Sequence, residues 1–197
     1  LAIDVLSEEF KKRKKGFISI FVAKLWLQYV VGKANKLVYN TAEKDKTSKG
    51  MGTTLCMALL FKDKIYVVNV GDSRCYIVKD DALEQVTRDQ TYVEYQLARH
   101  EINEDQKLTS IDRHALMNFI GKEKIANYQL KVIQNERRNI LLCSDGLYNN
   151  ASNKQIFSSA STNERLDQKI NTLIGIAKAN GGTDNIAISM WEPINND

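Results

Sequence analysis

The chain has 197 residues, of which 43% are hydrophobic and 26% charged, and its 28 basic and 24 acidic residues give a net charge of +4. This length and composition indicate one soluble globular domain, residues 1–197, with a sizeable core. The small net charge, without an arginine-rich face bearing interleaved aromatic side chains, argues against nucleic acid as a partner.

The first fifty residues have a helical pattern of apolar side chains. This pattern predicts a helix over about 1–10, a break at Gly16, a longer helix over about 17–42 and a lysine-rich loop over 43–49. The basic residues at 11–15 either contact an anionic surface or form the solvated end of a helix, and a single block favours the second interpretation.

Membrane association is not expected from the apolar pattern. The most apolar window, residues 17–31, is shorter than the roughly 20 apolar residues that a membrane span needs, and polar residues interrupt it. The three cysteines, Cys56, Cys75 and Cys143, lack the spacing of metal ligands. We interpret them as small buried hydrophobic residues in a reducing compartment, which favours a cytoplasmic protein.

Strand-like patterns follow the lysine-rich loop. Residues 53–61, 64–70 and 75–78 are short apolar runs, and the last two are separated by a turn at 71–73. We interpret the three runs as a meander of antiparallel strands. Because the runs are almost continuously apolar, we expect both faces of their sheet to be covered.

The second half of the chain alternates helical and strand-like patterns around a long irregular stretch, residues 90–125. This order predicts an α+β fold in which helices pack on mainly antiparallel sheets. The predicted helices span about 92–100, 153–159 and 166–179, and the predicted strands span 128–133, 140–144 and 185–191.

Two aspartates stand beside glycine at the ends of predicted strands. Asp145 follows the apolar run 140–143 and precedes Gly146, while Asp184 follows two glycines and precedes the last strand. Carboxylates gathered at strand ends suit Mg²⁺ or Mn²⁺, which prefer oxygen ligands. From spacing alone, however, a capping role for Asp145 and an Asx-turn at Asp184 are the stronger interpretation.

Five short motifs change this balance, because together they resemble the metal-dependent protein phosphatases, the type-2C serine/threonine phosphatases of the compact bacterial kind. They occur in the family's order and approximate spacing, and the match runs from about residue 50 to 192. The motifs are GMGTT at 50–54, VGDSR at 70–74, TRD at 87–89, LCSDGL at 142–147 and GTDN at 182–185.

The resemblance implies a β-sandwich of two antiparallel sheets flanked by helices, with two Mn²⁺ or Mg²⁺ ions at one end. It implies Asp145 and Asp184 as metal ligands, and Asp89 as a ligand of a third, weaker ion. Residues 71–74 are interpreted as an architectural turn with an internal ion pair between Asp72 and Arg74.

The resemblance also implies a flap over residues 90–121, in which His100 and His114 are expected to be solvated rather than catalytic. The implied activity is hydrolysis of phosphoserine and phosphothreonine in proteins by a metal-activated water, with no catalytic residue in this chain beyond the metal ligands. Cys143 would be a bystander.

Two departures from the family pattern qualify this expectation. Asn149 stands where relatives usually carry a second aspartate, so it is at best a weak ligand and the third ion is in doubt. The family's phosphate-binding arginine and its D-G-x-G-G segment, whose aspartate bridges both ions, have no counterpart in the chain. We expect a truncated chain, because it begins at Leu1 rather than Met.

The alternatives are a naturally degenerate family member or a missing portion that a partner supplies. The chain alone would then be inactive, with an exposed sheet edge through which two copies could dimerise. The competing functions are a pseudophosphatase, which binds a protein without catalysis, and a regulator that dephosphorylates an anti-sigma-factor antagonist, as some relatives do.

Overall fold

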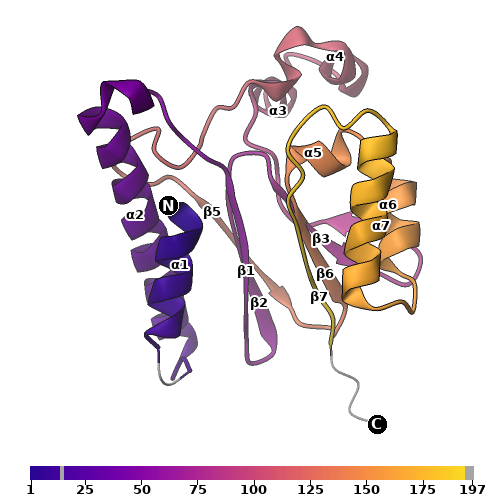
Figure 1. Ribbon diagram of the computed structural model, residues 1–197, viewed down its shortest axis with the longest axis horizontal. Helices are drawn as coiled ribbons and strands as arrows, with labels where there is room; N and C mark the ends of the chain where they lie inside the picture. The colour runs from indigo at the N-terminus through magenta and orange to yellow at the C-terminus, as the bar shows by residue number, and fades with distance from the viewer. Residues whose placement is uncertain (14–15, 194–197) are drawn as a thin grey trace. The chain divides into compact units, whose positions relative to one another are not determined.

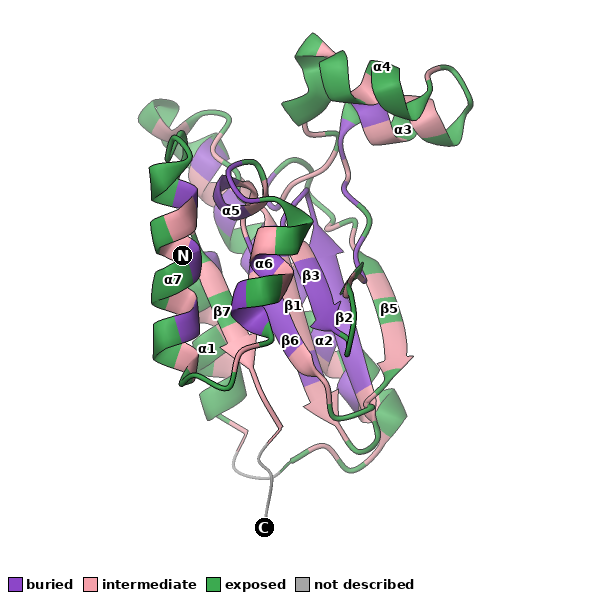
Figure 2. Cartoon of the chain, turned by 90° about the vertical axis from the view of Figure 1, so that its right-hand side faces the viewer, coloured by how far each residue is buried: buried purple, intermediate pink, exposed green. Residues whose placement is uncertain are grey.

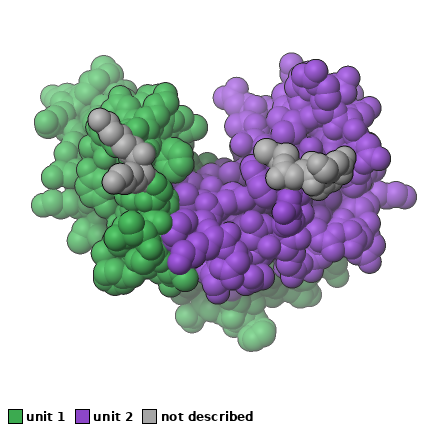
Figure 3. Space-filling view, turned by 90° about the horizontal axis from the view of Figure 1, so that it is seen from below, with its two compact units in different colours: residues 1–55, 90–129 green, residues 56–89, 130–197 purple. Residues whose placement is uncertain are grey.

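The computed structural model describes residues 1–13 and 16–193, and the chain divides into two compact units (Figure 1). Unit 1 comprises residues 1–55 and 90–129, and unit 2 comprises residues 56–89 and 130–197; Figure 3 colours them green and purple. Two residues of the basic block, Lys14 and Lys15, lie outside the described residues.

Unit 1 is helical. Its two longest helices contact each other side by side (Figure 1), and Phe10 and Phe17 both meet the ring of Trp26 edge to face. Ser19 begins the longer helix, because its hydroxyl accepts the backbone N–H of Val22. The helices are α1 (Ala2–Lys11), α2 (Ile20–Lys44), η1 (Lys46–Ser48), α3 (Tyr92–Ala98), α4 (Glu104–Thr109) and η2 (Ile111–His114).

Residues 90–129 join unit 1 through buried amide contacts. Asn35 of α2 accepts the Gly121 N–H at 2.8 Å and donates to the carbonyl oxygen of Glu123 at 2.9 Å. Gly121 has a φ of 93°, and a Cβ there would lie 2.5 Å from Val38 Cγ1. The single domain with a flap over 90–121 stays a prediction; the structure groups this segment with the first 55 residues.

Unit 2 is built on two sheets. The first has the order β1-β2-β5, and the second, antiparallel throughout, has the order β4-β3-β6-β7. The elements are β1 (Leu55–Phe61), β2 (Lys64–Val70), β3 (Arg74–Val78), β4 (Leu83–Gln85), β5 (Gln129–Gln134), β6 (Asn139–Cys143), α5 (Asp145–Tyr148), α6 (Asn153–Ala160), α7 (Leu166–Ala179) and β7 (Ile188–Trp191).

Alternating side chains of β3 and β6 supply two cores. One face, with Cys75, Ile77 and Ile140, packs against Ile65 and Val67 of β2 and forms the interior between the sheets. The opposite face is covered by α5, α6 and α7, and the buried strands stand out in purple in Figure 2. Its core residues are Tyr76, Leu141, Cys143, Leu147, Ala151, Ile156, Leu173 and Ala177.

The predicted sandwich of two antiparallel sheets flanked by helices is therefore confirmed, but the predicted meander is wrong. β2 and β3 follow each other in the chain yet belong to different sheets. Gly71, with a φ of 97°, provides the turn at which the chain crosses from one sheet to the other. The short elements β4, α4 and α5 were not predicted.

Two of the three cysteines match their interpretation as buried thiols, whereas Cys56 is half-buried; all three are free of disulfides. Cys75 and Cys143 are buried, and desolvation raises the pKa of each thiol to about 12, so neither suits a nucleophile. None of the helices in residues 1–13 and 16–193 combines the length and the apolar character that a membrane span requires.

Candidate active site at the α5 end of the second sheet

Asp145 lies where the buried strand β6 ends and the short helix α5 begins. Ile140, Leu141 and Cys143 are buried on the strand, whereas Asp145 is half-buried. Its Oδ1 accepts the N–H of Gly146 at 3.0 Å. The apolar strand thus fixes the position of a carboxylate at the end of the sandwich.

Pairing between β6 and β7 brings Asp184 to the same end. Cys143 pairs with Ile188, and the Ser144 N–H donates to the Ala187 carbonyl at 3.0 Å. The Ser144 hydroxyl also donates to the Asn185 carbonyl at 3.1 Å. Asp184, which is exposed, therefore lies one residue beyond a segment bonded to the residue before Asp145.

Gly146 makes this approach sterically feasible. A Cβ at position 146 would lie 2.3 Å from the Asn185 carbonyl oxygen and 3.3 Å from that of Asp184, closer than real Cβ atoms come in the first case. The glycine after Asp145 is thus required by the loop that carries Asp184. The segments that carry the two distant aspartates therefore lie side by side at one end of the second sheet. The role of both aspartates as metal ligands stays a prediction.

Asp72 is a third carboxylate at this end, and the sequence interpretation missed its importance. It is 6% exposed in the turn between β2 and β3. Burial and then the negative charges of Asp145 and Asp89 raise its pKa to about 6. The signal was present in the sequence, because Asp72, like Asp145, follows an apolar strand and stands beside a glycine.

The expected ion pair between Asp72 and Arg74 is wrong, because Arg74 binds Asp89 instead. Its Nε lies 3.0 Å from Asp89 Oδ1, and its Nη2 lies 2.7 Å from Oδ2. Gln85 Nε2 donates to Oδ1 at 2.9 Å. Asp89 is 9% exposed, and both its carboxylate oxygens accept hydrogen bonds from these side chains. Its role as a ligand of a third ion stays a prediction, and these contacts argue against it.

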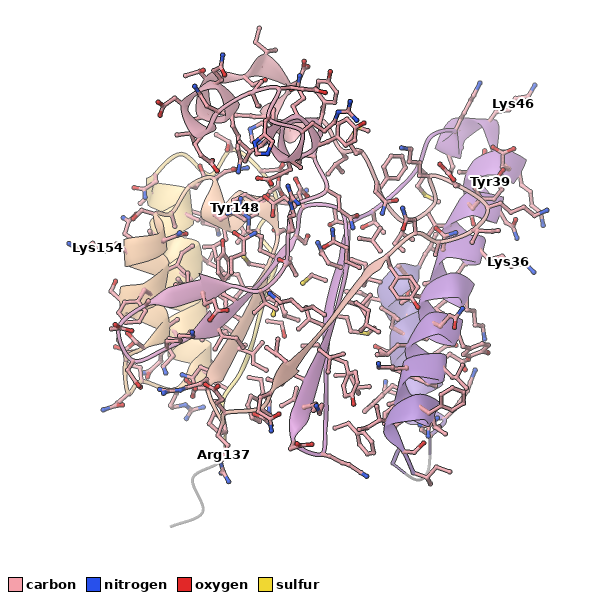
Figure 4. All side chains as sticks on the ribbon, turned by 180° about the vertical axis from the view of Figure 1, so that it is seen from behind. Lys36, Tyr39, Lys46, Arg137, Tyr148 and Lys154 are labelled. Atoms are coloured by element: carbon pink, nitrogen blue, oxygen red, sulfur yellow. The ribbon has the colours of Figure 1, made fainter. Side chains whose placement is uncertain are left out.

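Tyr148 connects this ion pair to α5, at one end of the sheet (Figure 4). The Arg74 guanidinium lies 3.5 Å from the centroid of the Tyr148 ring, and Arg74 Nη1 donates to Tyr76 Oη at 3.0 Å. Tyr148 Oη donates to the Asp72 carbonyl at 3.1 Å. The ring therefore braces the turn that carries Asp72 against the helix that carries Asp145.

The remaining predicted site residues are all exposed. Asn149 follows α5 and donates its backbone N–H to the Asp145 carbonyl at 2.9 Å. In unit 1, His100 has a φ of 59°, and His114 Nε2 accepts from Arg113 Nε at 2.8 Å. Their expected roles, a weak metal ligand for Asn149 and solvated flap positions for the histidines, stay predictions.

The donor set fits a hard divalent cation that keeps part of its water shell. Asp72 and Asp145 repel each other strongly enough to contribute to the raised pKa of Asp72, and a cation would relieve that repulsion. The described residues contain no group of three acidic, histidine or cysteine side chains arranged to hold an ion. Mg²⁺, which binds through one or two carboxylates and several waters, tolerates so sparse a set.

Comparison with known proteins decides the family. The family model described as Protein phosphatase 2C matches residues 2–181. The chain belongs to the protein phosphatase 2C family. The serine/threonine phosphatase Stp of Listeria innocua is 28% identical over 193 residues, which cover 98% of this chain and 76% of that protein.

Solved structures of this family share the fold. A bacterial serine phosphatase superposes with a TM-score of 0.87 at 25% identity and covers 98% of this chain and 80% of its own. The Mycobacterium tuberculosis serine/threonine phosphatase PstP/Ppp gives a TM-score of 0.85 at 26% identity, with coverages of 97% and 79%. The family and fold inferred from the five motifs are thus confirmed.

Proposed function

We propose that this protein phosphatase 2C member hydrolyses phosphoserine and phosphothreonine in proteins with the help of bound Mn²⁺ or Mg²⁺. The observation that carries the proposal is the meeting of Asp145 and Asp184 beside Gly146, at the end where Asp72 is also buried. The relatives' names supply the substrate class.

In this proposal each acidic residue has a separate task. Asp145 and Asp184 hold the ions, and Asp72 adds negative charge beside Asp145. Arg74 neutralises Asp89 and so keeps that carboxylate in place as a support for the turn. When bound, the ions lower the pKa of a water and offset the charge of the phosphoryl oxygens. Oxygen donors accept both Mg²⁺ and Mn²⁺, so metal availability selects between them.

Hydrolysis of p-nitrophenyl phosphate tests this proposal. We expect hydrolysis that requires Mn²⁺, stops with EDTA, and falls at least about 100-fold in Asp184→Ala, because loss of a ligand should exceed the 10–100-fold cost of losing an outer-shell partner. Asp80→Ala is the matched control, since Asp80 is exposed and pairs with Arg138. Metal-independent hydrolysis, or full activity in Asp184→Ala, would contradict the proposal.

Phosphopeptides test the substrate class. We expect release of phosphate from phosphothreonine and phosphoserine peptides, and preference for phosphotyrosine would contradict it. Pairing of two copies through a sheet edge is a further proposal, and light scattering of the chain at several concentrations tests it.

A further inference from the structure

Asn150 lies just beyond α5 and is 8% exposed, unlike its exposed neighbour Asn149. Its Nδ2 donates to the Gly146 carbonyl at 3.0 Å, within the helix that Asp145 begins. The same Nδ2 lies 3.3 Å from Thr183 Oγ1, in the residue before Asp184. One amide group therefore contacts both segments that carry the predicted metal ligands.

The backbone of Asn150 adds a second contact to the same loop. Its carbonyl oxygen accepts from Asn180 Nδ2 at 2.8 Å, at the end of α7. The loop leaves α7 through two glycines with positive φ, 134° at Gly181 and 56° at Gly182, and the Gly182 N–H donates to the Ala177 carbonyl at 3.0 Å. Glycines allow this path but do not fix it, so side-chain contacts must hold the loop in place.

We propose that Asn150 is a positioning residue, which sets the separation of Asp145 and Asp184 by tying the loop 180–184 to α5. Its role in metal binding rests on the proposed function, whereas the tether itself does not. The amide is needed because it donates to the Gly146 carbonyl while remaining within bonding distance of Thr183. Alanine at 150 would leave the buried Gly146 carbonyl without this donor.

Hydrogen exchange of the metal-free protein tests the tether. We expect the amides of residues 181–187 to exchange about tenfold faster in Asn150→Ala, because local opening becomes easier when a buried hydrogen bond is lost. Asn139→Ala is the matched control: Asn139 also donates its amide, to Glu192 Oε1 at 3.0 Å, but it lies at the other end of β6. Unchanged exchange in folded Asn150→Ala would overturn the proposal.

Calorimetry with Mn²⁺ tests the consequence for the site. We expect the Kd of Asn150→Ala to rise about tenfold, within the range for outer-shell residues, and that of Asn139→Ala to stay unchanged. A merely structural role would reduce the folded fraction but leave the Kd of the folded protein unchanged, which would overturn positioning. If the unaltered chain binds no Mn²⁺, the proposed function fails, and the exchange experiment still decides the tether.

Thr183→Val provides a second test of the tether that still applies if Asn150→Ala does not fold. Thr183 is exposed, and valine keeps its shape while removing the hydroxyl that lies beside Asn150. We expect exchange of residues 181–187 to rise about threefold, since one weaker contact is lost. No change in Thr183→Val together with a misfolded Asn150→Ala would overturn the proposal, because Asn150 would then be needed only for folding.

Discussion

The two ends of the second sheet differ in how their charges are balanced. At the far end, three carboxylates form ion pairs: Glu84 with Lys79, Asp80 with Arg138, and Glu192 with the buried Lys169. At the α5 end, Arg74 is bound by Asp89. Among the described residues, no ion pair reaches the three other carboxylates, Asp72, Asp145 and Asp184.

This difference separates charged side chains that stabilise the fold from carboxylates that are available to a ligand. Pairs at the far end hold strand ends and α7 together, and Figure 4 shows Arg137 at that end, opposite Tyr148. Carboxylates gathered without a matching cation cost stability, and this cost favours the proposed binding of a positive ligand at the α5 end. The charge imbalance is thus the physical basis for placing the site there.

The largest expected effect comes from removing the arginine at each end. Arg74→Met leaves Asp89, which is 9% exposed, as a buried unpaired charge and should lower the free energy of unfolding by about 3 kcal/mol. Arg138→Met breaks a pair whose partner side chain is 80% exposed, so solvent screening should make its cost much smaller than that of Arg74→Met. Urea unfolding measures both. Equal losses would mean that the two ends do not differ in burial of charge.

Substitution of glycine by alanine tests the close approach of the backbone at the α5 end. Gly146→Ala should lower the free energy of unfolding by about 2 kcal/mol, because its Cβ would meet backbone atoms of Asn185 that cannot move without shifting Asp184. Gly175→Ala, in α7 with nothing within 4 Å of the added Cβ, should raise it by about 0.5 kcal/mol. Thermal unfolding of both variants checks this, and a neutral Gly146→Ala would contradict the close approach.

The pH dependence of stability should have opposite signs at the two ends. The pKa of Asp72, about 6 in the folded chain, is raised, so the folded state keeps a proton that the unfolded state has lost. Stability should therefore fall by about 2 kcal/mol between about pH 4 and about pH 6 in EDTA, and Asp72→Asn should remove this fall.

Asp80 provides the contrast in the same measurement. Its hydrogen bond with Arg138 lowers its pKa, so its contribution is present above its ordinary pKa and is lost as the pH falls. Urea unfolding at several pH values measures how much free energy of unfolding each variant, Asp80→Asn or Asp72→Asn, loses or gains relative to the unaltered chain. This difference should change with pH in opposite directions for the two variants. If both differences changed with pH in the same direction, burial and the charges of Asp145 and Asp89 would not raise the pKa of Asp72.

Strong local patterns allowed the sequence to predict most elements. The predicted bounds of β2 and α7 match the structure, because continuous apolar runs and helical periods leave few alternatives. The strand β4 has three residues and no period, and its existence depends on pairing with β3. The helix α4 carried an overlooked signal, since Asn103 and Gln106 form a capping box.

For the site, the meeting of Asp145 and Asp184 was predictable from the motifs, whereas the partner of Arg74 was not. Arg74 begins β3, and Asp89 follows the short strand β4. Their ion pair therefore depends on the path of the chain between them rather than on neighbours in sequence. The importance of Asp72 became clear only from its burial and from the charges around it.

Calorimetric titration with Mn²⁺ tests whether the carboxylates at the α5 end hold a metal ion. The unaltered chain is titrated alongside Asp145→Ala, Asp184→Ala and the far-end variant Asp80→Ala. We expect Mn²⁺ binding in the unaltered chain and in Asp80→Ala, and at least about 100-fold weaker binding in the other two variants. Binding that is equally strong in all four proteins, or absent from the unaltered chain, would contradict it.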